Sequence, residues 1–190
     1  MLNKCLKKVI AGEYLESTEA YDVARMLLNG HSSLVKAGAI LGAMRTRKES
    51  VEELRGFIEA IYEQAVTLDS DVELIDTCGT GGDGLGTFNI STLSALITAS
   101  CGIPVAKHGN QAITSKVGSA DVLMALGVNV RLTPDEARRL LDRVGITFLF
   151  APYYHPILKE VAGLRREIGA ATIFNLLGPL LNRSEEHTSE

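Results

Sequence analysis

Hydrophobic residues recur at helical spacing throughout residues 1–70, and polar or glycine-containing stretches separate one apolar stripe from the next. The fourth stripe follows Ser50 and Glu53, the pattern of a capping box in which the serine hydroxyl accepts from the Glu53 amide while the carboxylate reaches back. Residues 1–70 therefore predict a small N-terminal helical domain. The stripes are Leu2, Leu6, Val9 and Ile10, which precede Gly12; Val23, Leu27 and Leu28, which precede Gly30; Leu34, Ile40, Leu41 and Met44; and Leu54, Phe57, Ile58 and Ile61.

After Asp71 the pattern changes to short apolar segments that alternate with helical ones. Thr133 and Glu136 form a second capping box with Pro134 in the first turn, and Gly145 can end this helix. Strands that alternate with helices predict an α/β fold with a parallel sheet, whose ligands bind at the carboxyl ends of the strands. We expect strands at 72–76, 104–107 and 146–151, and helices at 92–100, 119–126 and 133–144.

The C-terminal part of the chain predicts two further helices, at 157–168 and 172–181, which we expect to pack on the helical domain. The last eight residues, RSEEHTSE, are polar and differ abruptly from the apolar LLGPLLN before them. Three strands are also few for a parallel sheet. We therefore expect a helical domain at 1–70, an incomplete α/β domain at 71–182 and a foreign tail at 183–190, so that the chain is a fragment.

The composition excludes several classes of protein. Of the 190 residues, 46% are hydrophobic and 22% are charged, which is typical of a globular chain and excludes a disordered or fibrous one. The net charge of −4 does not favour nucleic acid or a membrane surface, and no apolar run approaches about 20 residues. Cys5, Cys78 and Cys101 have neither metal-ligand nor disulfide spacing. Because the N-terminus lacks a secretory signal, we expect a cytoplasmic protein. From the net charge and the lack of a long apolar run, we expect no nucleic-acid partner and no membrane partner.

A glycine-rich loop at 76–92, DTCGTGGDGLGTFNIST, follows the first predicted strand. Its glycines let backbone amides approach an anion, and Ser91 or Thr92 places a hydroxyl at the start of the next helix, which favours phosphate. Residues 79–84 also match GxGxxG, but a dinucleotide fold needs an acidic residue about 20 residues further on. No acidic residue lies between Asp83 and Asp121. We therefore expect a phosphate-binding loop rather than a dinucleotide site.

A second polar loop, KHGNQAITSKVGSAD at 107–121, follows the next predicted strand. Lys107 and Lys116 supply cations, and several hydroxyl and amide side chains supply hydrogen bonds. Two such loops at adjacent strand ends fit a substrate that carries more than one phosphate.

The two loops, followed by FAPYYHP and RREIGAATIFNLLGPLLN, resemble in order and separation the anthranilate phosphoribosyltransferases of tryptophan biosynthesis. The resemblance runs from the N-terminal helices to Asn182. It implies the fold class α/β, with a small N-terminal helical domain plus a truncated parallel-sheet α/β phosphoribosyltransferase domain. It further implies a homodimer formed through the helical part, Mg2+ as cofactor, and phosphoribosyl pyrophosphate and anthranilate as substrates. The implied reaction moves the phosphoribosyl group to the amine of anthranilate and releases pyrophosphate.

Matched residue by residue, the resemblance also implies the roles of individual side chains. Ser91 would hold magnesium, and Gly79, Asn110 and Arg165 would bind anthranilate, with Arg165 facing its carboxylate. Lys107 and His108 are the candidate catalytic residues, although His108 is alternatively a histidine that only shapes the loop. Phosphoribosyl pyrophosphate would contact Gly79, Gly82, Asp83, Thr87, Asn89, Ile90, Ser91, Thr92, Lys107, His108, Gly109, Asn110, Gln111, Ala112, Ile113, Thr114, Ser115 and Ser119.

Several departures from the family's pattern bear on this interpretation. Gln111 and Ala171 stand where arginine is common, Val117 where a small polar residue is common, and Met124 where glutamate is common. The adjacent Asp and Glu that bind magnesium in the family have no counterpart within the resemblance. Because two of these departures remove a cationic side chain, we expect them to weaken anion binding.

Two alternatives stay open. A pyrimidine nucleoside phosphorylase of the same fold has a similar second loop but binds orthophosphate and a nucleoside, and GTGGDG followed by NIST favours the transferase instead. A non-catalytic relative that binds anions or nucleic acid would lose its ligand steeply with salt.

Overall fold

The computed structural model describes residues 1–30, 32–77, 88–111 and 117–181, and these fall into two units. The first unit combines Met1–Ala65 with His155–Leu181, and the second comprises Val66–Tyr154. The helices after residue 155 thus belong to the same unit as the N-terminal helices. No helix in the described part of the chain is both long and apolar enough to cross a membrane.

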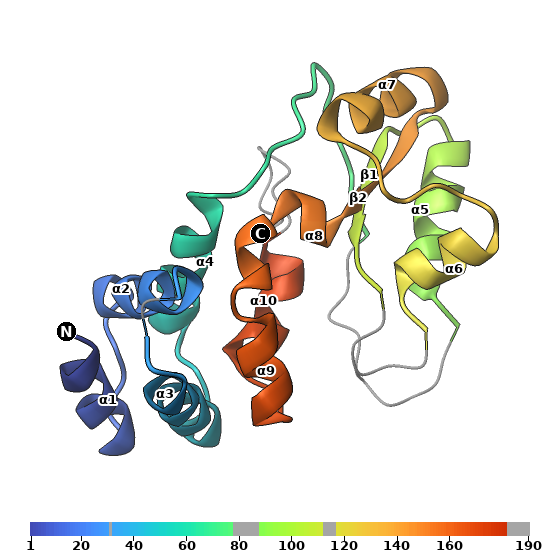
Figure 1. Ribbon diagram of the computed structural model, residues 1–190. Coiled ribbons are helices and arrows are strands. Elements are labelled where there is room, and N and C mark those ends of the chain that lie inside the picture. Colours follow the sequence, from blue (N-terminus) through green and yellow to red (C-terminus); the bar gives the residue numbers. More distant parts are fainter. Residues whose placement is uncertain (31, 78–87, 112–116, 182–190) are drawn as a thin grey trace. The chain divides into compact units, whose positions relative to one another are not determined.

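All regular secondary structure in the described residues of the first unit is helical (Figure 1). One hydrophobic core, which includes Val23, Ile40, Phe57 and Leu177, is shared by all of its α-helices. The helices are α1 (Leu2–Ile10), α2 (Ser17–Leu28), α3 (Leu34–Arg47), α4 (Val51–Tyr62), the short 3-10 helix η1 (Pro156–Lys159), α9 (Ala162–Ile168) and α10 (Ile173–Leu180).

Helices α2 and α4 make the most extensive contact in this unit, and a glycine permits it. A Cβ at Gly56 would lie 2.6 Å from the amide nitrogen of Tyr21 and 2.8 Å from the Cβ of Ala20. On another side of α4, the rings of Phe57 and Phe174 meet edge to face with centroids 5.6 Å apart. That contact joins α10 to α4 across more than a hundred residues of sequence.

The capping box predicted at Ser50 and Glu53 is present. The Glu53 amide donates to the Ser50 hydroxyl at 3.2 Å, and the Glu53 carboxylate accepts from the Ser50 amide at 2.9 Å. The predicted face of α1 is partly wrong, because Ile10 is 66% exposed whereas Cys5 is fully buried. Positions 2, 5 and 9 keep the i, i+3, i+7 spacing of one helical face, and residue 10 lies about 100° away from residue 9.

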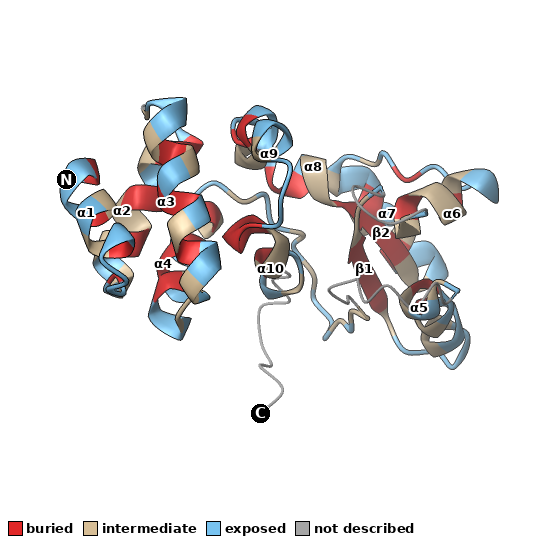
Figure 2. Cartoon of the chain, turned by 90° about the horizontal axis from the view of Figure 1, so that it is seen from below, coloured by how far each residue is buried: buried red, intermediate tan, exposed pale blue. Residues whose placement is uncertain are grey.

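Within its described residues, the second unit holds a two-stranded parallel sheet. Val105 pairs with Ile146 at one end of the register and Gly109 pairs with Phe150 at the other. Both strands are buried along most of their length (Figure 2). The elements are α5 (Ile90–Ser100), β1 (Val105–Gly109), α6 (Ser119–Ala125), α7 (Pro134–Val144), β2 (Ile146–Phe150) and α8 (Ala151–Tyr154).

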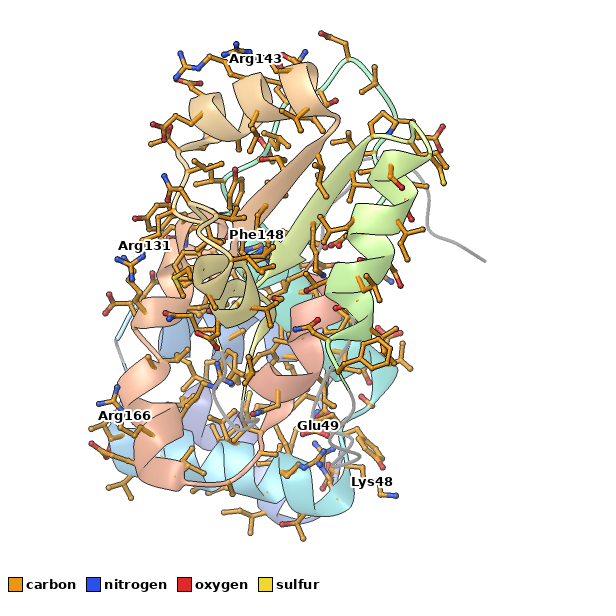
Figure 3. All side chains as sticks on the ribbon, turned by 90° about the vertical axis from the view of Figure 1, so that its right-hand side faces the viewer. Lys48, Glu49, Arg131, Arg143, Phe148 and Arg166 are labelled. Carbon is orange, nitrogen blue, oxygen red and sulfur yellow. The ribbon has the colours of Figure 1, made fainter. Side chains whose placement is uncertain are left out.

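Alternation along β2 directs its side chains to two layers. Phe148 and Phe150 share a hydrophobic cluster with Leu123 of α6, whereas Leu149 shares another cluster with Ala137 of α7. Figure 3 shows Phe148 inside the unit and Arg143, at the end of α7, on its outside. The helices therefore cover opposite faces of β2, as expected for an α/β unit.

The strand predicted at 72–76 is reduced to a single bridge, in which Ile75 pairs with Val105. The Ser70 hydroxyl accepts from the Val72 amide at 3.3 Å and donates to the Val72 carbonyl at 3.0 Å, so the chain bends where the strand would begin. The helix predicted at 157–168 is likewise split into η1 and α9. Pro156 starts η1, where the amide of Leu158 donates to the carbonyl of His155, three residues back.

Candidate functional site

Lys107 and His108 are the third and fourth of the five residues of β1, whose carboxyl end is where α/β folds bind their ligands. Both are buried, with exposed fractions of 3% and 6%. The Lys107 ammonium donates to the hydroxyl of Ser91, with Nζ and Oγ 3.3 Å apart. A buried ammonium next to a helix start is an environment that favours an anion.

Ser91 lies in the first turn of α5, which Asn89 caps. The Asn89 Oδ1 accepts from the Thr92 amide at 3.2 Å, from the Thr92 hydroxyl at 2.8 Å and from the Ser91 hydroxyl at 3.2 Å. Asn89 and Thr92 thus shape the helix start, while Ile90 is 55% exposed beside them. The helix dipole adds partial positive charge at this end.

Asp76 and Thr77, to which the sequence pattern assigned no role, contact β1 and the start of α5. The carboxylate of Asp76 accepts from the His108 amide at 3.1 Å, and the Thr77 hydroxyl donates to the Ser91 carbonyl at 2.6 Å. Their position directly after an apolar segment was the available signal, because that position is a strand's carboxyl end in an α/β fold.

The start of the second loop is tied to the start of α6. The carbonyl of Asn110 accepts from the Ser119 hydroxyl at 3.4 Å and from the Ala120 amide at 3.2 Å. Gly109 leaves no space for a side chain, since a Cβ there would overlap the Ser119 hydroxyl and lie 2.8 Å from the Phe148 ring. Gln111 extends this link by donating from Nε2 to an oxygen of Asp121 at 3.3 Å.

Arg165 belongs to the other unit, on α9. Its guanidinium lies over the ring of Phe174, 5.9 Å from the centroid, and burial lowers its pKa from the ordinary value. Among the described residues, no carboxylate forms an ion pair with it. The neighbouring Arg166 is exposed and points outward in Figure 3, so the two arginines have different environments.

The described part of the chain therefore brings together Asn89, Ser91, Thr92, Lys107 and His108. Eight further predicted positions lie outside the described residues: Gly79, Gly82, Asp83, Thr87, Ala112, Ile113, Thr114 and Ser115.

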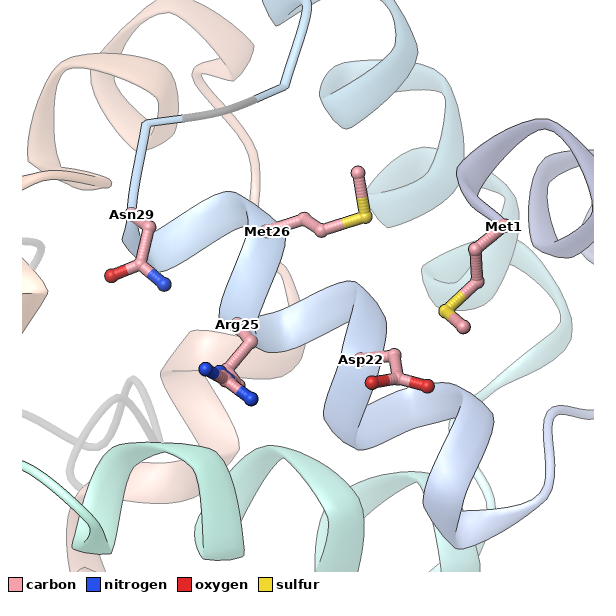
Figure 4. Close-up of a pocket in the computed structure, with 5 residues that line it drawn as sticks. All are labelled: Met1, Asp22, Arg25, Met26 and Asn29. Carbon is pink, nitrogen blue, oxygen red and sulfur yellow. The ribbon is translucent and has the colours of Figure 1, made fainter.

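The buried groups Tyr154 and His155 and a surface hollow add no residue to the candidate site. Burial raises the pKa of Tyr154 to about 12 and lowers the pKa of His155, so both are neutral near pH 7. A shallow hollow on the first unit is lined by Met1, Asp22, Arg25, Met26 and Asn29 (Figure 4), and it includes none of the predicted site residues. Within the described ranges, no three His, Cys, Asp or Glu side chains gather as a metal site would require.

Comparison with known protein families gives two matches that together cover most of the chain. Residues 3–65 match the helical bundle domain of the glycosyl transferase family, and residues 71–189 match the a/b domain of the same family. The two matches follow the order of the helical and α/β parts of the chain.

Individual relatives agree with these matches. The chain is 67% identical over 182 residues to the anthranilate phosphoribosyltransferase of Syntrophomonas wolfei, covering 96% of this chain and 54% of the relative. It is also similar to the crystal structure of anthranilate phosphoribosyltransferase from Thermus thermophilus, with a TM-score of 0.84, 46% identity and coverage of 94% of this chain and 54% of that one.

A further likeness is to anthranilate phosphoribosyltransferase from Saccharomyces cerevisiae in complex with PRPP and Mg, with a TM-score of 0.84, 30% identity and coverage of 95% and 54%. The chain thus spans about half the length of the relatives it matches. These likenesses confirm the resemblance found in the loops. By its helical bundle and a/b domains, the chain belongs to the glycosyl transferase family.

Proposed function

We propose that this chain binds phosphoribosyl pyrophosphate and anthranilate, and that it serves the transfer of the phosphoribosyl group to the anthranilate amine. The products are N-(5-phosphoribosyl)anthranilate and pyrophosphate, a step of tryptophan biosynthesis. The observation that carries the proposal is the contact between Lys107 and Ser91 at the start of α5. The names of the relatives support the same activity.

The residues around Lys107 suit the departure of pyrophosphate. Charge develops on the leaving group as the bond to the anomeric carbon breaks, and a positioned ammonium stabilises that charge best where water is excluded. Lys107 is buried, and its ammonium lies against the first turn of α5. The dipole of α5 adds partial positive charge at that turn. We infer that Lys107 holds the pyrophosphate group while the ribose passes through a cation-like state.

The oxygen donors beside Lys107 fit a magnesium ion that is shared with substrate phosphates. Mg2+ usually takes one or two protein oxygens and fills the rest of its octahedron with water and phosphate. The Ser91 hydroxyl supplies one such oxygen, and its present neighbour is the Lys107 ammonium. Two cations at one hydroxyl repel each other, so we expect Ser91 to bind magnesium together with phosphate and not before it. When bound, the ion would neutralise the charge of the leaving pyrophosphate.

Recognition of anthranilate requires one cation and little acid–base chemistry. The guanidinium of Arg165 has no described carboxylate partner, which suits the substrate's carboxylate. Asn110 accepts the Gln111 amide with its side-chain oxygen, which leaves its amide nitrogen to donate to a ligand. An aniline nitrogen is mostly unprotonated at neutral pH, so attack needs positioning more than a general base. His108 is therefore proposed to position the loop and its substrate.

Calorimetry of the 190-residue chain tests the proposal directly. We expect phosphoribosyl pyrophosphate to bind in the presence of magnesium and to bind more weakly when the metal is chelated. Anthranilate fluorescence then reports turnover. Binding of orthophosphate with a pyrimidine nucleoside, and not of phosphoribosyl pyrophosphate, would replace the transferase with a phosphorylase. Binding of nucleic acid that falls steeply with salt, with no turnover, would support a non-catalytic relative.

The proposal includes the homodimer and the cytoplasmic location expected from the sequence. Light scattering during size-exclusion chromatography measures the mass of the chain in solution. We expect twice 20.4 kDa, and a monomer at micromolar concentration would contradict the dimer.

A further inference from the structure

Asp76 closes a ring of contacts that joins three segments of the second unit. Its Oδ2 accepts from the His108 amide at 3.1 Å, and its Oδ1 accepts from the Thr77 amide at 2.5 Å. The neighbouring Ile75 pairs with Val105, which places Asp76 alongside β1. The carboxylate therefore contacts the backbone at the end of the strand that carries Lys107.

The ring continues through the start of α5. The Thr77 hydroxyl donates to the Ser91 carbonyl at 2.6 Å, and the Ser91 hydroxyl accepts from the Lys107 ammonium at 3.3 Å. Peptide bonds join Asp76 to Thr77 and Lys107 to His108. Three hydrogen bonds and two peptide bonds thus link segments that lie up to 32 residues apart in sequence.

The Asp76 carboxylate acts on the backbone at this point. A negative charge in contact with a phosphate would repel it. The two oxygens of Asp76 are directed to two backbone amides, and only a carboxylate can accept at both atoms. Hydrogen bonds to an ionised acceptor are stronger than those to a neutral one.

We propose that Asp76 is a positioning residue that fixes the Lys107–His108 backbone against the first turn of α5 and thereby sets the affinity for a pyrophosphate group. This inference rests on the proposed function. Asp76 acts through Lys107 and Ser91, and the distance between their side chains is what it controls. Loss of the carboxylate lets the end of β1 shift away from α5, because the His108 amide loses its acceptor.

The test compares D76N, D76A and T77V with D71N as the matched control. Asp71 belongs to the same unit, but its side chain is 88% exposed and it pairs with Arg138. Calorimetry measures the Kd of magnesium phosphoribosyl pyrophosphate and, separately, of magnesium pyrophosphate. A thermal melt measures stability, and the proton shift of the His108 amide reports its hydrogen bond.

We expect D76N to raise both Kd values about tenfold, D76A to raise them further, and D71N to leave them unchanged. The effect of D76N should be the smaller one because asparagine retains one oxygen that can accept a hydrogen bond. The His108 amide proton should move upfield in D76N and D76A. T77V keeps Asp76 and breaks only the link to Ser91, so it should also weaken binding, and it keeps the inference testable if the Asp76 variants do not fold.

Unchanged Kd values in D76N and T77V alongside a lowered melting temperature would overturn the inference, because the ring would then be merely structural. If the wild-type chain binds pyrophosphate but not phosphoribosyl pyrophosphate, the proposed function fails while the pyrophosphate affinities still decide the role of Asp76. If it binds neither, both proposals fall.

Discussion

The Nζ of Lys107 lies 3.3 Å from the Oγ of Ser91, although the two residues are 16 positions apart in sequence. One group comes from the middle residue of β1 and the other from the first turn of α5. A buried ammonium thereby meets the positive end of a helix. Because two sources of positive charge repel each other, we expect this arrangement to be stabilised when an anion binds here.

Replacement of Lys107 by methionine removes the ammonium and retains most of the buried stem. We expect the Kd of magnesium phosphoribosyl pyrophosphate to rise about tenfold to a hundredfold, the effect of losing one charge-assisted hydrogen bond worth about 1.5–3 kcal/mol. Calorimetry measures the change. The control K159M alters an exposed lysine of the other unit and should leave the Kd unchanged. Equal affinity in K107M and wild type would remove Lys107 from the site.

Substitution of Ser91 by alanine removes the oxygen proposed to contact magnesium. The magnesium concentration that half-saturates phosphoribosyl pyrophosphate binding should rise by about twofold to tenfold, as expected for one neutral hydrogen-bond or ligand oxygen. Titrations of magnesium at fixed substrate measure it. S100A makes the same change at the other end of α5, where the hydroxyl donates to the Ile97 carbonyl, and should have no effect. A magnesium dependence that is unchanged in S91A would assign the ion to other oxygens.

Local chemistry in the sequence was enough to predict the N-terminal caps of two helices, α4 and α7. Ser50 with Glu53, and Thr133 with Glu136, form capping boxes as predicted. The residues of each box lie three apart, so their contacts depend little on the rest of the fold. Gly145 ends α7 with a φ of 77°, a backbone conformation that suits glycine.

Contacts between distant segments could not be predicted in the same way. The acceptor for the His108 amide is 32 residues away in Asp76, and no local pattern indicates this pairing. The bend at Ser70 also shortens a segment whose composition alone favours a strand. The sequence indicated that Lys107 and Ser91 belong to phosphate-binding loops. Their direct contact depends on the packing of α5 against β1.

Arg165 and Arg166 provide an internally matched pair for anthranilate recognition. We expect R165A to raise the Kd of anthranilate at least tenfold, because a bidentate contact to a carboxylate is lost, with little effect on phosphoribosyl pyrophosphate. R166A changes an exposed neighbour and should alter neither Kd. R165K retains the positive charge but loses the planar guanidinium, which can donate two hydrogen bonds to one carboxylate. Its affinity for anthranilate should therefore fall between those of R165A and wild type. A matching loss of phosphoribosyl pyrophosphate affinity in R165A would contradict a role specific to anthranilate.

Helix α5 exposes apolar side chains that should make the chain bind hydrophobic dyes. Ile90 is 55% exposed, Leu93 is 46% exposed and Ile97 is 54% exposed, and these positions share one face at i, i+3 and i+7. We expect I97K to lower both the fluorescence of a bound dye and concentration-dependent association. V51K removes an exposed apolar side chain from the first unit and is the matched control. Equal effects of I97K and V51K would show that dye binding and association do not depend on the apolar face of α5.

Glu53 stabilises the first unit, and its contribution depends on pH. Burial disfavours its charge, but hydrogen bonds from Arg47 and from the amides of Ser50 and Leu15 outweigh this and hold its pKa below the ordinary value of 4.5. A lowered folded-state pKa means that the stabilisation is complete above 4.5 and is lost as the pH falls through the lowered value. We expect E53Q to reduce the free energy of unfolding by about 3 kcal/mol at pH 7, because Arg47 loses its buried partner.

Urea unfolding of wild type and E53Q between pH 7 and pH 3 measures this contribution. The difference between the two proteins should shrink as the solution becomes acidic. Glu19 and Glu136 also have lowered pKa values, so wild type and variant both lose some stability in acid, and only the difference isolates Glu53. E52Q alters the exposed neighbour in the same helical turn and should leave the unfolding free energy within about 0.5 kcal/mol of wild type. A constant difference between wild type and E53Q across this range would mean that the variant acts through lost packing, and that the carboxylate's charge contributes nothing.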